Sequence, residues 1–411
     1  MLKNYLLMAS KVYMRRKMFT LINLACIVLT LVVLLVVTAV MEHSFAPSGV
    51  DVNRDRIVTV SFYTKYGKNI SMSGGLGFKL IEQYLKPIAA ADRVSAVTRP
   101  FPVAVYQDDH VERLNMRFTD AAFWEIFQYH LIEGRFFQVS DIDQGKSVVV
   151  MNKVIARKLF GDASALGKKL NVRSHQYEVI GVVDDGQKGT GNPEMWAPHT
   201  SMPSSSYREA LDGDFNAVLL AKSPADLPAL KKAVFENGSH IVEDDPVKWT
   251  RTLLLANTAF DNFARGFSSN SRGEESGAEQ VMAWIILLML LFMLLPALNL
   301  VNLNLGRMME RSAEIGVRKA FGASTMELVK QFLIENVLLS LLGCMVALLL
   351  TQGFLMWVNH TGFLPNMNLG INFKIFVYGL LITVVFGIIS GVAPAWRMAK
   401  LDPVFALKGN A

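Results

Sequence analysis

The stretch MFTLINLACIVLTLVVLLVVTAVM, residues 18–41, runs for 24 residues without a charged side chain. A helix that crosses a hydrocarbon core of about 30 Å needs roughly 20 such residues. Three further stretches, 281–305, 332–358 and 375–396, are almost as apolar, whereas nothing between residues 42 and 279 comes close. Because 52% of the chain is hydrophobic and only 18% is charged, we expect a membrane protein with four transmembrane helices.

The first apolar stretch also has the basic flank of a secretory signal peptide. Its length exceeds the roughly 7–15 residues of a typical signal-peptide core. A small-residue cleavage pattern at 44–46 is followed directly by Pro47, which disfavours cleavage. We therefore expect residues 18–41 to stay in the protein as the first transmembrane helix.

Basic residues gather on one side of the expected membrane. They lie before the first span, between the second and third, and after the fourth: Lys3, Lys11, Arg15, Arg16, Lys17, Arg307, Arg311, Arg318, Lys319, Lys330, Arg397, Lys400 and Lys408. The loop between the third and fourth spans ends in a single one, Lys374. Since lysine and arginine accumulate in cytoplasmic loops, both termini are predicted to be cytoplasmic and residues 42–280 to be exported.

The charge of the chain follows this topology. Residues 42–280 contain 27 basic and 30 acidic residues, whereas the rest of the chain contains 14 and 5. The basic pI of about 9.1 therefore reflects the membrane-flanking segments and gives no support for nucleic acid binding, which needs a basic patch on a folded domain. Cys26 and Cys344 both fall in expected spans, so the exported domain is predicted to fold without disulfides.

Periodicity predicts a mixed α/β structure for the exported domain. Alternating apolar residues favour strands near 58–62, 114–118 and 216–221, and a hairpin at 170–179. A short helix is expected at 152–160, ended by Gly161, and another at 225–235, with Ser223 as its cap and Pro224 at its first position.

The loop at 306–331 has the pattern of a short amphipathic helix. Arg311, Glu314 and Arg318 share one face, while small residues share another. Gly322 suits the position after a helix end, and Ser324 begins a capping box for the helix that enters the third span. This loop is either a connector at the lipid interface or a docking element for a cytoplasmic protein.

The same loop resembles the signature of MacB/FtsX-type permeases of ABC transporters, also called type VII. The matching residues run from Glu310-Arg311 through EIGVRKAFGAS, residues 314–324. The ending PA at 394–395 and LDPVFALK at 401–408 is similar to the end of that family. In the exported domain, EGRFF at 133–137, ARKLFG at 156–161, LGK at 166–168 and VIGVV at 179–183 resemble its periplasmic core domain.

This resemblance implies a permease dimer, either homodimeric or heterodimeric, in the cell inner membrane. Each copy would bind a cytoplasmic ABC ATPase through the coupling loop, and ATP hydrolysis would move the periplasmic domain to export or extract a substrate, an action called mechanotransmission. The implied ATPase-coupling residues are Glu310, Arg311, Glu314, Ile315, Arg318, Lys319, Gly322, Ala323 and Ser324. A periplasmic adaptor protein and membrane lipid are further candidate partners, and the substrate-binding residues stay unknown.

These predictions combine into one expected layout of the chain. It comprises a cytoplasmic amphipathic N-terminal helix at 1–17, transmembrane helices at 18–41, 281–305, 332–358 and 375–396, a periplasmic MacB-like core domain at 42–280, the coupling loop at 306–331, a short periplasmic loop at 359–374 and a cytoplasmic tail at 397–411. The core domain is expected to have a porter-like lobe, about 51–118 and 214–256, with an inserted second lobe at about 119–213.

No cofactor is expected in this chain. The nearest approach to the Walker A pattern GxxxxGK[ST], residues 161–169, has the wrong spacing and lacks the final hydroxyl. ATP and magnesium are therefore expected in a separate ATPase chain, which makes this a stand-alone permease similar in layout to LolC/LolE-like permeases. MacB itself, in contrast, contains its own ATPase.

Two other functions compete with transport. An FtsX-like protein uses the same motion to activate a periplasmic cell-wall hydrolase, but has a much smaller exported domain. A membrane-anchored enzyme would need a catalytic pattern, and the histidines of 42–280 show no HxxH or HExxH spacing and no GxSxG elbow accompanies them. We therefore expect no catalytic or metal site in this chain.

Overall fold

The computed structural model describes residues 17–107, 110–173, 175–184, 193–243, 245–267, 273–310, 325–363 and 369–371, together with separate positions between 373 and 392. The chain divides into two compact units. One contains the two terminal parts, Met1–His43 and Met282–Ala411. The other, Ser44–Val281, is called here the α/β domain.

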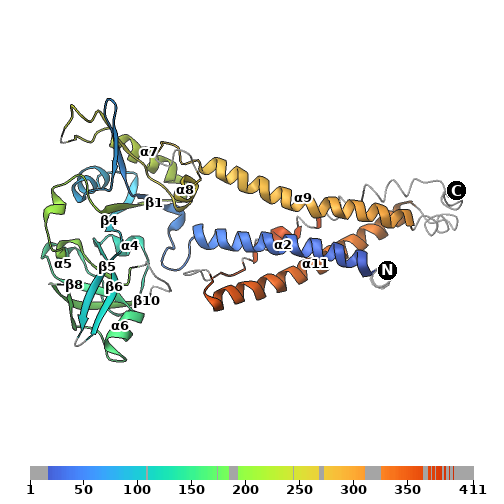
Figure 1. The fold of residues 1–411 in the computed structure, drawn as a ribbon, viewed down its shortest axis with the longest axis horizontal. Coiled ribbons are helices and arrows are strands. Elements are labelled where there is room, and N and C mark those ends of the chain that lie inside the picture. The colour runs from blue at the N-terminus through green and yellow to red at the C-terminus, as the bar shows by residue number, and fades with distance from the viewer. Residues whose placement is uncertain are drawn as a thin grey trace. The chain divides into compact units, whose positions relative to one another are not determined.

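Long apolar helices form the described part of the terminal unit (Figure 1). They are α2 (Lys17–Phe45), α9 (Ala278–Glu310) and α11 (Thr325–Thr361), of which residues 44–45 of α2 and 278–281 of α9 belong to the α/β domain. Over Thr20–Phe45 and Leu333–Thr361, two of them are long and apolar enough to cross a membrane, and α9 contributes a shorter apolar stretch. Most of the fourth expected span lies outside the described residues, so the number of four transmembrane helices stays a prediction.

Helices α2 and α11 pack closely where a glycine permits it. Ile27 and Leu31 of α2 are buried together with Cys344 and Ala347 of α11. A Cβ atom at Gly343 would lie 2.6 Å from a methyl carbon of Ile27, so this close contact requires a glycine, which has no side chain, at position 343. Small residues allow close helix approach of this kind in membranes.

A large mixed sheet organises the α/β domain. Among the described residues it has ten strands in the order β1-β12-β4-β6-β11-β8-β10-β9-β5, and β7 pairs with β10. Its strands are β1 (Ile57–Val60), β4 (Ala91–Thr98), β5 (Phe101–Gln107), β6 (His110–Thr119), β7 (His130–Gly134), β8 (Val148–Asn152), β9 (Lys169–Val172), β10 (His175–Asp184), β11 (Met195–Pro198) and β12 (Phe215–Ala221). A second sheet has the order β13-β2-β3, formed by β2 (Tyr63–Tyr66), β3 (Ser71–Gly74) and β13 (Arg251–Leu254).

Short helices cover these sheets. They are α3 (Phe78–Leu80), which continues as the π-helical η2 (Ile81–Leu85), α4 (Phe123–Ile126), α5 (Val139–Asp143), α6 (Lys153–Phe160), α7 (Leu227–Gly238) and α8 (Ala259–Arg265). Single 3₁₀ turns are η1 (Arg54–Arg56), η3 (His199–Ser201), η4 (Ser206–Arg208) and η5 (Pro224–Asp226). Strands β1 and β9 alternate between buried and more exposed residues, whereas β8 and β11 are buried along their whole length, so both faces of the sheet are covered there.

Among the residues that the structure describes, three buried clusters hold the α/β domain together. One lies between β1, β12 and α7 and contains Leu80 and Leu230. A second joins β5 and β6 to β8–β11 through residues such as Leu114 and Val179. The third is aromatic and is built around Trp124 and Trp196. Each fully buried aliphatic side chain stabilises the fold by about 1.5–3 kcal/mol, so these clusters are the main source of stability.

Several local predictions can be compared with these elements. Helix α6, expected at 152–160, begins at Lys153, and Gly161, with φ of 66°, ends it as expected. Asn152 is its cap, whose side chain accepts from the Ile155 amide at 2.9 Å. The β9–β10 hairpin is also confirmed. Ser223 is a cap residue and Pro224 takes the first position after it, as expected, but the segment they begin is the 3₁₀ turn η5, and α7 starts only at Leu227. The Ser223 hydroxyl donates to the Asp226 carboxylate at 2.8 Å and makes no cap bond to the backbone. The lobe boundaries stay a prediction.

Candidate functional site

The expected coupling residues fall almost entirely outside the described part of the chain. Glu310 is the last residue of α9. The other eight lie outside the described residues: Arg311, Glu314, Ile315, Arg318, Lys319, Gly322, Ala323 and Ser324. Their role therefore stays a proposal, and the described chemistry lies in two regions of the α/β domain.

The first region surrounds α8 and is called here the junction. It consists of α8 with its flanking residues 257–258, the segment 273–278 and the contacts they make. Helix α8 begins with a capping box, in which the Thr258 hydroxyl accepts from the Asp261 amide at 3.1 Å and the Asp261 carboxylate accepts from the Thr258 amide at 2.7 Å. This pairing satisfies backbone donors that the first turn of a helix leaves open.

Asp261 also links α8 to two other helices. Its carboxylate pairs with the Lys231 ammonium of α7 and accepts from the Ser276 hydroxyl at 2.8 Å. The Ser276 oxygen in turn accepts from the amide of Ala278, the first residue of α9, at 3.2 Å. Burial opposes the charge of Asp261, but the bonds from Lys231, Thr258 and Ser276 outweigh it and lower the pKa of the carboxyl.

Arg265, the last residue of α8, is buried and also binds the segment 273–278. Its guanidinium donates to the side-chain oxygen of Asn257 at 2.9 Å and to the carbonyl of Gly273 at 2.8 Å. Asn257 exchanges backbone hydrogen bonds of 2.8 and 3.0 Å with Thr59 of β1. Burial lowers the pKa of Arg265, and Asp261 partly offsets that effect. An arginine stays protonated in proteins, so the site holds a buried cation.

Aromatic contacts complete the junction. Phe45, the last residue of α2, meets Phe260 and Phe263 of α8 edge to face, with ring centroids 5.2 and 5.4 Å apart. Such pairs contribute about 0.5–1.5 kcal/mol beyond the area they bury. Helix α8 therefore contacts both places where the chain enters and leaves the α/β domain, and it is bonded to α7 and β1 within the domain.

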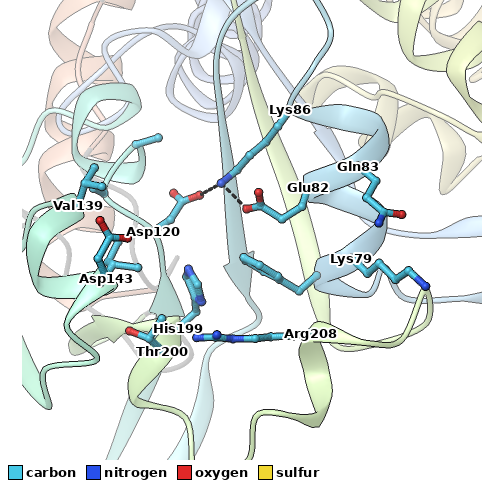
Figure 2. Close-up of a pocket in the computed structure, with 14 residues that line it drawn as sticks. Lys79, Glu82, Gln83, Lys86, Asp120, Val139, Asp143, His199, Thr200 and Arg208 are labelled. Carbon is cyan, nitrogen blue, oxygen red and sulfur yellow. Dashed lines mark ion pairs between the residues drawn. The ribbon is translucent and has the colours of Figure 1, made fainter.

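The second region is an open cleft of about 640 Å³ in the α/β domain (Figure 2). Its lining residues come from three distant parts of the chain: Phe78, Lys79, Glu82, Gln83, Lys86, Asp120, Ala121, Ala122, Val139, Ile142, Asp143, His199, Thr200 and Arg208. Its volume lies within the range of about 300–1,000 Å³ that is typical of small-molecule sites.

An ion-pair cluster crosses one end of the cleft. Lys86 lies between Glu82 and Asp120, at nitrogen–oxygen distances of 2.5 and 3.4 Å (Figure 2). Asp120 is fixed by the Ser95 hydroxyl at 2.6 Å and the Ala96 amide at 3.1 Å. Burial disfavours the charge of Lys86, but Asp120 and Glu82 outweigh it and raise the pKa of the ammonium. Lys86 is therefore a charged ammonium that two carboxylates pair with and hold in place.

His199 forms part of the floor of the cleft. Its ring lies 4.4 Å from that of Phe78, and its Nδ1 is 3.0 Å from the Tyr207 hydroxyl. Burial, together with the nearby charges of Lys86 and Arg208, lowers its pKa to about 3. The imidazole is therefore neutral at physiological pH and cannot serve as an acid with a pKa near 7. Within the described residues, no three His, Cys, Asp or Glu side chains come together as metal ligands.

Sequence reasoning missed both regions. The junction has a local signal, because Thr258 and Asp261 have the spacing of a capping box. The cleft has none, because its walls come from the segments 78–86, 120–143 and 199–208, which only the tertiary fold brings together.

Two protein families match this chain. Residues 20–235 match the family described as MacB-like periplasmic core domain, and residues 286–403 match the FtsX-like permease C-terminal.

Individual relatives have low sequence identity to this chain. The chain is 26% identical over 292 residues to the macrolide export ATP-binding/permease protein MacB of Neisseria gonorrhoeae, a match that covers 69% of this chain and 42% of that protein. It is 28% identical over 333 residues to the ABC transporter permease YknZ of Bacillus subtilis, covering 79% and 77%. The chain thus spans less than half the length of the MacB protein it matches.

Among solved structures, the extracellular domain of YknZ from Gram-positive bacteria matches 48% of this chain and 99% of that domain, with 18% identity and a TM-score of 0.37. The periplasmic region of MacB from Actinobacillus actinomycetemcomitans matches 46% of this chain and 85% of that region, with 17% identity and a TM-score of 0.36.

Proposed function

The chain belongs to the family of ABC transporter permeases with a MacB-like periplasmic core domain and an FtsX-like C-terminal region, and from that premise we propose how it works. The family expected from the sequence is thereby confirmed. A permease of this family acts in transport or signalling. We propose that this one uses ATP hydrolysis by an ATPase outside these 411 residues to move its α/β domain, and that the movement exports or extracts a substrate.

The observation that supports this mechanism is a single helix. Helix α9 runs without interruption from Ala278, at the junction, to Glu310, the first of the expected coupling residues. At about 1.5 Å per residue, its 33 residues extend roughly 50 Å. A force on the coupling loop would reach Ser276 and Asp261 through this one continuous element, and the buried bonds of α8 would pass it to α7 and β1.

The remaining parts of the proposal follow the family. The coupling loop at 306–331 would bind a cytoplasmic ATPase, with Glu314 and Arg318 as an attractive pair on one helical face and Gly322 at its turn. Two permease copies would form a dimer in the inner membrane, through four transmembrane helices each, with both termini cytoplasmic and the α/β domain in the periplasm. An adaptor protein is a further candidate partner.

The first test is purification of the tagged protein from its native membranes in mild detergent, followed by partner identification and an ATPase assay. We expect an ABC ATPase at about one copy per permease. The double reversal Glu314→Lys with Arg318→Glu should abolish this association, although it keeps the net charge of the loop.

A matched control reverses an exposed pair elsewhere. Arg157 and Asp162 lie 3.0 Å apart on the surface of the α/β domain, and reversing both should leave ATPase recovery unchanged. If the coupling-loop variant also retained the ATPase, the loop assignment would be wrong. Recovery of a cell-wall hydrolase as the main bound partner would instead favour the FtsX-like signalling function.

A further inference from the structure

Helix α8 has its charged side chains inside the α/β domain and its aromatic side chains outside. Asp261 and Arg265 are buried. Phe263, in contrast, is 39% exposed, and Phe267, which follows the end of the helix, is 70% exposed. A helix on the surface of a soluble domain normally has the opposite arrangement, with its apolar stripe inside and its charges outside. This reversal favours an apolar environment next to the outer face of α8.

The exposed rings belong to a continuous row of phenylalanines. The amide of Phe267 donates to the carbonyl of Ala264 at 3.0 Å, so the backbone keeps turning past the end of α8. The ring centroids of Phe263 and Phe267 are 5.0 Å apart, and those of Phe260 and Phe263 are 6.0 Å apart. Because Phe45 contacts Phe260 and Phe263, the row begins at the last residue of α2 and runs along α8.

The length of α2 sets the level at which this row meets a membrane. Its 29 residues, Lys17–Phe45, extend about 43 Å at about 1.5 Å per residue. A bilayer is about 30 Å thick without its headgroup regions and about 40–45 Å thick with them. With Lys17 in one headgroup region, Phe45 therefore falls in the headgroup region of the opposite leaflet. Trp284 marks the same boundary in α9, because it is exposed at the start of the expected span 281–305 and tryptophan is typical of the membrane–water interface.

The size of the exposed surface favours lipid over a protein partner. A phenylalanine side chain can bury about 150–250 Å², so the exposed parts of Phe263 and Phe267 together present roughly 200 Å². A stable protein–protein interface buries about 800 Å² on each partner. A helix at a membrane surface, in contrast, needs only its apolar face to enter the boundary between headgroups and acyl chains, by about 5–10 Å.

We propose that α8 lies on the membrane surface, with Phe263 and Phe267 inserted among the phospholipids of the leaflet that faces the α/β domain. The inference rests on the proposed function, because it requires α2 and α9 to cross the membrane. It goes further by giving α8 a lipid contact of its own. Asp261 bonds α8 to α7, and Arg265 bonds it through Asn257 to β1, so this contact would also anchor the α/β domain to the bilayer.

The test uses nitroxide spin labels, which report whether a side chain lies in lipid, in water or under protein. The full chain is prepared with Cys26→Ala and Cys344→Ala, which removes both native thiols, and single cysteines are then introduced for labelling. The main probe is Phe267→Cys. After reconstitution into vesicles of phosphatidylethanolamine and phosphatidylglycerol, electron paramagnetic resonance measures collisions of the label with oxygen, which concentrates in lipid, and with a nickel chelate, which stays in water.

Two reference positions are needed to interpret the result. Val154→Cys, at an exposed valine of α6, should give the signal of water, and Leu29→Cys, at an exposed leucine of α2, should give the signal of lipid. We expect the ratio of oxygen to nickel collisions for Phe267→Cys to lie severalfold above that for Val154→Cys and below that for Leu29→Cys, as for a side chain near the headgroups. Phe263→Cys is a second probe of the same face and should agree with Phe267→Cys.

The outcomes separate this inference from the proposed function. A lipid signal for Leu29→Cys with a water signal for Phe267→Cys would overturn the lipid contact of α8 and leave the membrane topology in place. Protection of the label at position 267 from both reagents would mean that protein covers the row, which also overturns the inference. A water signal for Leu29→Cys would mean that α2 does not cross the membrane, and the inference would then fall together with the proposed topology.

Discussion

At the junction, the carboxylate of Asp261 and the guanidinium of Arg265 are buried and bonded on several sides, whereas in the cleft Arg208 and Asp143 are exposed and have no ionic partner within the described structure. The two regions use the same residue types in the same domain. Removing a partner from a buried pair leaves an uncompensated charge, which costs about 3–5 kcal/mol, while exposed pairs contribute about 0–1 kcal/mol. The junction is therefore suited to hold its shape and the cleft to exchange ligands.

The largest expected effect tests the buried side of this comparison. Asp261→Ala would remove the bonds to Lys231, Thr258 and Ser276 and open the first turn of α8, so we expect a loss of about 2–3 kcal/mol in the stability of the α/β domain. Thermal unfolding of the full chain, followed by near-ultraviolet circular dichroism, measures the change. Asp162→Ala, at an exposed pair, should shift the midpoint very little.

Because the pKa of Asp261 is lowered, the effect of Asp261→Ala on stability should depend on pH. Because the folded-state pKa is lowered, the stabilisation is complete above the unfolded value of about 3.9 and is lost as the pH falls through the lower folded value. The difference in stability between the native protein and Asp261→Ala should therefore shrink in acid. A difference that stayed constant down to pH 2 would contradict the ionic role.

His199 provides the next largest effect, from a buried group of the cleft. Its folded-state pKa of about 3 lies below the unfolded value of about 6.5, so the unfolded chain gains a proton first as the pH falls. Stability should fall by about 2 kcal/mol between pH 6.5 and 5. Chemical denaturation at the two pH values, compared with His199→Gln, measures this loss. A variant with the same pH dependence would show that other groups cause it.

Regular elements were the easiest part of this fold to predict from sequence. The apolar stretch at 18–41 lies within α2, and α6 lies within the expected 152–160 and ends at Gly161, because these signals are local. The position of the cap Ser223 before Pro224 was predictable for the same reason, but its bond was not, because its hydroxyl donates to the Asp226 carboxylate. The cleft was not predictable, because it depends on how β6 and β11 bring residues 120 and 199 near η2.

Ser276 tests whether the junction transmits force as well as holding shape. Ser276→Ala removes the bonds to Asp261 and the Ala278 amide but leaves the Lys231 pair in place, so the cost to stability should be only about 1 kcal/mol. If α8 couples α9 to the domain, substrate movement per ATP hydrolysed should nevertheless fall severalfold. Ser164→Ala, which removes an exposed hydroxyl bond to Glu133, is the matched control. Equal coupling in both variants would leave the junction with a structural role only.

Arg208 should give the smallest effect on stability. Its side chain is exposed and its described polar contact is the Tyr207 hydroxyl, so Arg208→Ala should change the unfolding free energy by less than about 0.5 kcal/mol. This cost would be far below the one expected at Asp261, which is buried and lies away from the cleft. If Arg208→Ala destabilised the domain as strongly as Asp261→Ala, the cleft would be part of the rigid framework, because only an arginine needed for folding could cost so much at an exposed position.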